Sequence, residues 1–214
     1  MYSPNSTYYK LARDHNYIAY FADEDCLVNL AGKYNYLETP YYAVQDLENE
    51  GKEIHPTNKE SLDGYIAPIF LEKARLANIP LPAYYITNGF FEPPVIVDTI
   101  NPFMQRTRFV LKASRQAGVA KSLTRNFTYA VCCQEIPAGA RVKYFREVLG
   151  WSVSRRHREL AQMIWKAFRI PVARIRILIL ENGEALLSSI DPLPFQKLNS
   201  RELSYIQGKV KWPE

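Results

Sequence analysis

Polar and charged side chains that could bind a ligand gather in two stretches of the C-terminal half. Ser189 and Asp191 come where a short apolar run ends in Ser-Ser-Ile-Asp-Pro. The end of a strand is where sheet folds tend to place reactive or ligating groups. The second stretch, residues 139–176, carries ten lysines and arginines against two glutamates. Such a concentration of positive charge can attract phosphates, acidic peptides or nucleic acid.

The basic stretch also has structural interpretations. It could be a solvated face, or it could dock on residues 1–60, which carry ten acidic residues against five basic ones. Within it, residues 155–158 read Arg-Arg-His-Arg and lie near Trp151, which could stack on a base. No RNA-binding signature accompanies them, and a tryptophan is as commonly a core residue. These alternatives stay open at the level of the sequence.

Other reactive residue types lack the spacing that their chemistry requires. The three histidines form no metal-spaced set, and Ser188-Ser189 have no G-x-S-x-G context for a nucleophile. Cys26 stands alone and Cys132-Cys133 are adjacent, so no C-x-x-C pair suggests zinc or a redox disulfide. We expect these cysteines to be buried strand residues.

The elements that position the polar residues are a hairpin and a helix. A β-branched run from Ile175 to Leu180 meets Asn182-Gly183 and a second apolar run, Ala185 to Leu187. Asn-Gly between two such runs predicts a β-hairpin. Residues 159–169 place apolar side chains at i, i+3 and i+4 and predict an amphipathic helix.

Strands and helices alternate along the rest of the chain, which indicates an α/β or α+β class. Pro68 is expected to kink or split the helix over 59–78. The other expected strands are 17–21, 41–44, 83–87, 94–99, 108–112, 126–136 and 141–149, and the other expected helices are 44–50 and 198–208.

Composition agrees with a soluble globular protein. The chain has 214 residues, of which 47% are apolar and 23% charged, and its net charge is +5. Its N-terminus does not read as a signal peptide, and no apolar run approaches the roughly 20 residues that span a bilayer. We therefore expect a cytoplasmic protein that does not associate with membranes.

Five segments, in order over residues 60–195, resemble the ATP-grasp superfamily and its RimK-like branch. They read LEKARLANIPLPAYYI, PPVIVDT, CCQEIPAG, ARVKYFREVLGWSVSRRHR and ELAQMIWKAFRIPVARIRILILENGEALLSSIDPLPF. The resemblance implies an α/β (α+β) ATP-grasp-like fold with two small sheet-containing subdomains. Residues 59–214 would form the ATP-grasp-like domain. Residues 1–58, acidic and rich in tyrosine, would be an N-terminal segment or a truncated pre-ATP-grasp domain.

The resemblance implies an ATP-dependent carboxylate–amine ligase that acts on a peptide or a small acid through an acyl phosphate. Such chemistry uses ATP and Mg²⁺. Carried onto this sequence, the family's adenine-contacting hinge falls at Gln134, Glu135 and Ile136. Lys143 would join them in cofactor binding, and Arg141 and Arg146 would reach phosphate or an acidic substrate. Asp191 and Ser189 fall at the metal positions.

The same comparison reveals departures from the family pattern. The expected phosphate lysine falls at Asp98, an expected acidic residue falls at Arg176 or Ile177, and the usual glutamate falls at Ser189. No glycine occurs between Gly89 and Gly118, where the family has a flexible phosphate loop. Two alternatives therefore accompany the ligase. One is an inactive ATP-grasp-like binding or regulatory subunit that holds a peptide or protein partner at 139–176. The other is a nucleic-acid-binding module that uses this segment.

Overall fold

The structure is a computed structural model that describes residues 17–101 and 106–213. The chain forms two compact units. Unit 1 contains Met1–Leu62, Phe145–Arg174 and Asp191–Glu214, and unit 2 contains Asp63–Tyr144 and Ile175–Ile190. The division of the sequence after residue 58 into two domains stays a prediction, and residues 1–16 of its N-terminal segment lie outside the described residues.

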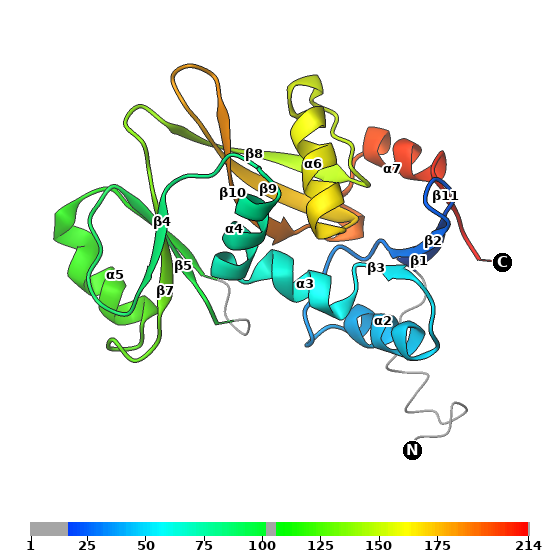
Figure 1. The fold of residues 1–214 in the computed structure, drawn as a ribbon, viewed down its shortest axis with the longest axis horizontal. Helices are drawn as coiled ribbons and strands as arrows, with labels where there is room; N and C mark the ends of the chain where they lie inside the picture. The colour runs from blue at the N-terminus through cyan, green and yellow to red at the C-terminus, as the bar shows by residue number, and fades with distance from the viewer. Residues whose placement is uncertain (1–16, 102–105, 214) are drawn as a thin grey trace. The chain divides into compact units, whose positions relative to one another are not determined.

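Unit 1 is built on a four-stranded sheet that joins the two ends of the described chain. Its strand order is β11-β1-β2-β3, and in Figure 1 the blue β1 lies beside β11 in red. The strands are β1 Ile18–Phe21, β2 Cys26–Asn29, β3 Ile54–His55 and β11 Val210–Lys211. The helices are α2 Thr39–Asn49, α6 Arg158–Phe168 and α7 Ser200–Gln207, with the 3-10 turns η3 Arg155–His157 and η4 Phe195–Lys197.

Helix α6 closes the core of unit 1 as its pattern predicts. Ala161, Ile164, Trp165 and Phe168 are buried along one face, and Trp165 packs edge-on against Phe21 of β1. Burying this apolar stripe stabilises the helix against the sheet more than its intrinsic propensity does.

Unit 2 contains a second four-stranded sheet, of order β4-β7-β5-β6. Its neighbouring strands are antiparallel. They are β4 Tyr84–Thr87, β5 Val95–Thr99, β6 Thr107–Val110 and β7 Val131–Glu135. The 3-10 turn η2 Ala113–Arg115 leads into α5 Gln116–Leu123, while α4 Ala67–Leu76 follows α3 Asn58–Tyr65. Val97, Cys133 and Leu123 belong to the apolar core on which this sheet closes.

A third sheet, of order β10-β9-β8, carries most of the residues that the sequence singles out. Its strands are β8 Arg141–Val148, β9 Val172–Ile179 and β10 Ala185–Pro192. The limits of the two units fall within these strands. Strands β9 and β10 are the predicted hairpin, whose turn places Gly183 at a φ of 87° (Figure 1).

The mixed α+β class is confirmed, and two local expectations need correction. Residues 41–44, expected as a strand, lie in helix α2, whose first turn carries Pro40. Asn126 and Phe127, expected at the start of a strand, have positive φ angles beyond the end of α5. The split expected near Pro68 in the helix over 59–78 is confirmed, because two helices separate there at Ile66. Proline lacks the N–H that a continuous helix would need there.

Candidate functional site

A buried ion pair between Arg176 and Asp98 is the most unusual chemical feature of unit 2. Arg176 lies on β9 and Asp98 on β5, and their side chains are 1% and 11% exposed. The guanidinium donates to both carboxylate oxygens, with Nη2–Oδ2 at 2.6 Å and Nη1–Oδ1 at 3.2 Å. This two-point geometry is the strong form of an arginine–carboxylate interaction.

Polar side chains from three further strands complete a network around the pair. Arg176 Nε donates to the Ser188 hydroxyl at 2.8 Å, and this hydroxyl donates to Gln134 Oε1 at 2.9 Å. Gln134 Nε2 donates in turn to Asp98 Oδ2 at 2.8 Å, which closes a ring of four side chains. The Thr107 hydroxyl accepts from Arg176 and donates to Asp98. A buried charge pair is tolerated only when its remaining hydrogen-bonding groups are satisfied in this way.

The sequence contains a signal for this network. Asp98 interrupts the apolar strand PVIVDT, and Arg176 interrupts RIRILIL. Charged residues are rarely buried without a partner, so a lone acid and a lone base inside two apolar strands predict one another. The uncharged members, Thr107 and Ser188, gave no such indication.

The hinge predicted at Gln134, Glu135 and Ile136 is engaged with its own sheet. The Gln134 side chain is fully buried in the network. The backbone N–H groups of Glu135 and Ile136 donate to the carbonyls of Ala83 and Pro94, at 2.9 and 3.1 Å. Glu135 and Ile136 also border a pocket of about 490 Å³ in unit 2, beside Tyr85 and Pro94.

The two residues at the predicted metal positions contribute a single carboxylate. Asp191 Oδ2 accepts from Arg174 Nη2 at 3.0 Å, and Ser189 is a half-buried residue of β10. Among residues 17–101 and 106–213, no group of three or more His, Cys, Asp or Glu side chains could hold a metal ion. The structure thus pairs Asp191 with Arg174, whereas Arg176 has Asp98 as its partner.

The basic residues predicted on β8 have different surroundings. Arg146 Nη1 donates to the Lys197 carbonyl at 2.9 Å and to Glu202 Oε2 at 3.2 Å, so it holds the start of α7. Arg141 and Lys143 are exposed. Neither forms an ion pair within the described part of the chain. They remain available to an anionic ligand, and the roles predicted for all the site residues remain predictions.

Burial makes the two cysteines beside the network poor nucleophiles. Cys132 and Cys133 are fully buried on β7. Burial, helped by the nearby Asp98 carboxylate, raises the pKa of the Cys132 thiol to about 12. Burial likewise raises the pKa of Cys133 to about 12. Both thiols are therefore protonated at neutral pH, and the thiolate is the reactive form.

Comparison with solved structures identifies the fold as ATP-grasp-like. A RimK-domain ATP-grasp protein from Sphaerobacter thermophilus matches with a TM-score of 0.56 at 14% identity, over 88% of this chain and 74% of that chain. D-alanine–D-alanine ligase from Helicobacter pylori matches with a TM-score of 0.58 at 15% identity, over 87% of this chain and 71% of that chain. No family model and no curated protein matches the sequence.

A third similar structure is the ATP-grasp ligase PsnB complexed with a minimal precursor, Mg and ADP. It matches with a TM-score of 0.50 at 16% identity over 81% of this chain. This chain spans 63% of the length of PsnB, which is less than two thirds. At these identities the comparisons establish the fold.

The residues at the family's metal and phosphate positions do not fit a magnesium–triphosphate group. A triphosphate needs cations, yet the resemblance puts Asp98 where a lysine is expected. Magnesium needs carboxylate oxygens, yet the resemblance puts Arg176 or Ile177, and Ser189, where acidic residues are expected. The two reversed charges lie 2.6 Å apart and neutralise one another.

Proposed function

We propose that this protein is a non-catalytic ATP-grasp-like binding or regulatory protein with a peptide or protein partner. The observation that carries the proposal is the buried Arg176–Asp98 pair. Because the two charges are spent on each other, Asp98 offers no free carboxylate to a magnesium ion and Arg176 no free cation to a triphosphate.

The peptide partner is supported by the fold and by charge. PsnB, which shares the fold, was solved with a minimal precursor, and the precursor in a related complex is a peptide. The basic segment 139–176 gives this chain a surface that attracts acidic groups.

An ATP-dependent carboxylate–amine ligase is the second candidate. The solved structures that share this fold include ligases, and the exposed Arg141 and Lys143 on β8 could approach a phosphate. This candidate requires that Mg·ATP binds despite the charge of Asp98. It also requires that Asp191 leaves Arg174 to serve a metal ion.

Isothermal titration calorimetry with Mg·ATP separates the two candidates. We expect no saturable binding at millimolar nucleotide. A D-alanine–D-alanine ligase, titrated in the same buffer, controls for the quality of the nucleotide. Saturable binding that is lost in Asp191→Ala would overturn the non-catalytic assignment and support the ligase.

A further inference from the structure

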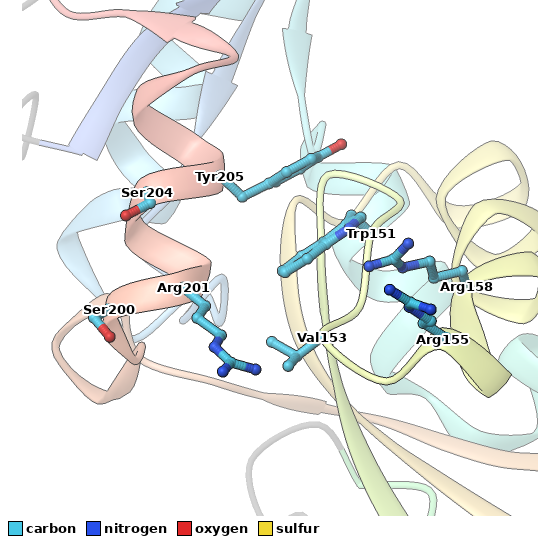
Figure 2. A pocket seen from close by; sticks show the side chains of 8 residues that line it. All are labelled: Trp151, Val153, Arg155, Arg158, Ser200, Arg201, Ser204 and Tyr205. Atoms are coloured by element: carbon cyan, nitrogen blue, oxygen red, sulfur yellow. The ribbon is translucent and has the colours of Figure 1, made fainter.

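Unit 1 contains a pocket that is separate from the residues considered above. Its volume is about 550 Å³, and Figure 2 shows that guanidinium groups face it from two sides. Arg201 extends from the first turn of α7 toward Val153, and Arg155 and Arg158 approach from the other side. The pocket thus gathers three permanent positive charges from elements far apart in the sequence.

The three pocket arginines differ from four arginines of the basic segment in lacking an acidic partner. Arg146, Arg169, Arg174 and Arg176 each form an ion pair with a carboxylate. In the part of the chain that the structure describes, the three pocket arginines form none. Among the described residues, Arg158 donates one hydrogen bond, from its Nε to the Ser152 carbonyl at 3.2 Å. Two unpaired arginines of the segment, Arg155 and Arg158, thus meet Arg201 of α7 at this pocket.

The aromatic wall of the pocket is already stacked. Trp151 and Tyr205 lie 4.6 Å apart between ring centroids with an interplanar angle of 10°. The Arg158 guanidinium lies over the Trp151 ring, 5.5 Å from its centroid. In Figure 2 the tyrosine and the guanidinium flank opposite sides of the indole. The indole is thus a rigid wall that positions Arg158, and it offers no free face to a nucleic-acid base.

We propose that this pocket binds the phosphate of a phosphorylated serine or threonine in a partner peptide. Guanidinium forks bind a phosphate dianion through paired hydrogen bonds. A cluster of arginines is the usual way in which proteins recognise phosphorylated peptides. The volume exceeds the needs of a phosphate alone, and the apolar side chains of Val153, Trp151 and Tyr205 provide contacts for the flanking residues. The choice of a peptide rests on the proposed binding function, whereas the anion site does not involve the Arg176–Asp98 network.

Retention of a degenerate pool of phosphoserine and phosphothreonine peptides on the immobilised protein tests this site. The same pool after phosphatase treatment is the control ligand. We expect retention of the phosphorylated pool only, weakened about 10- to 100-fold by Arg155→Ala/Arg201→Ala, since each charge-assisted bond is strong. Retention by Arg155→Lys/Arg201→Lys should lie between that of the wild type and that of the alanine variant. Lysine keeps the positive charge but lacks the two-pronged guanidinium.

The matched control is Lys121→Ala/Lys166→Ala, which removes the same charge from two exposed helical positions outside the pocket. It should retain the phosphorylated pool as the wild type does, and circular dichroism establishes that each variant is folded. Equal retention of both pools, or equal loss in the lysine control, would overturn the proposal. Tighter binding of a single-stranded oligonucleotide than of the phosphopeptides would also overturn it. Titration with Mg·ATP tests the Asp98–Arg176 site and does not involve this pocket. Failure of the phosphopeptide site is therefore distinguishable from failure of the proposed non-catalytic function.

Discussion

Arg176 is the side chain whose surroundings say most about this molecule. It is among the largest fully buried side chains of the described residues, and its guanidinium reaches Asp98, Thr107 and Ser188. Taking an ion pair out of water costs several kcal/mol, which a two-point contact and a closed ring of hydrogen bonds can offset. The network is thus a structural element of unit 2 that depends on both charges.

Removing one member of the pair should be costly. Arg176→Met leaves Asp98 buried without its cation, and we expect the free energy of unfolding to fall by about 3–5 kcal/mol. Replacing both residues by apolar ones, as in Arg176→Met/Asp98→Leu, should recover most of this loss because no charge is then stranded. Urea denaturation measures all three proteins. A loss below about 1 kcal/mol in Arg176→Met would show that the pair is not buried as described.

Of the predicted site residues, only Gln134 belongs to the buried network. The reversed charges at Asp98 and Arg176 are visible as departures from the family pattern. Their direct contact depends on how β5 and β9 are placed in the fold, which local sequence does not determine. Likewise, Asp191 is paired with Arg174, which lies two residues before Arg176 on β9.

At the scale of elements, helices and strands with strong local signals are predictable. The Asn-Gly hairpin, the amphipathic α6 and the capped α7 each carry a turn, a period or a cap in their own residues. Helix α5 went unrecognised because its eight residues include Gly118 and bury only Ala120 and Leu123. Residues 41–44 read as a strand because of their aromatic and branched side chains, and packing of Ala43 and Val44 overrides that preference.

Helix α7 owes its position to a capping box and to one arginine. The Asn199 side chain accepts hydrogen bonds from the backbone N–H groups of Arg201 and Glu202. In turn, the Glu202 carboxylate accepts from the Asn199 N–H at 2.8 Å. Arg146 neutralises this Glu202 carboxylate, which is 2% exposed. Arg146 therefore fastens β8 to α7 within unit 1.

Arg146→Ala should destabilise the protein by about 1–2 kcal/mol, since Glu202 stays buried without its cation. Lys143→Ala, on the same strand and exposed, should change stability by less than about 0.5 kcal/mol. Thermal unfolding followed by circular dichroism compares the two. Equal stability of the two variants would contradict a structural role for Arg146.

At the scale of the whole molecule, unit 1 brings distant segments of the chain together. Gly32 and Leu193 are joined by a backbone hydrogen bond of 2.9 Å, and Gly32 has a φ of 72°. A Cβ at Gly32 would lie 1.8 Å from the Leu193 carbonyl oxygen. Only glycine allows this approach, which fixes the N-terminal part of the described chain against the segment that follows β10.

Gly32→Ala should therefore cost about 3 kcal/mol or more, because it combines backbone strain with a clash against main chain. The matched control is Gly51→Ala, which has a similar φ of 74° but meets nothing within 4 Å. It should cost only about 1 kcal/mol, from the φ alone. Unfolding in urea gives both values. Similar losses for the two variants would mean that the Gly32–Leu193 approach does not hold the unit together.

No helix in the described part of the chain is long and apolar enough to cross a membrane. The proposed function rests on the ATP-grasp-like fold together with the buried Arg176–Asp98 pair.

Calorimetric titration with Mg·ATP tests this central claim most directly, when the wild type is compared with Asp98→Lys/Arg176→Glu. The exchange keeps an ion pair but restores the charges that the resemblance leads one to expect at these positions. We predict no saturation for the wild type at millimolar nucleotide and a measurable gain in affinity for the exchanged variant. Saturable binding of Mg·ATP by the wild-type protein would contradict the account.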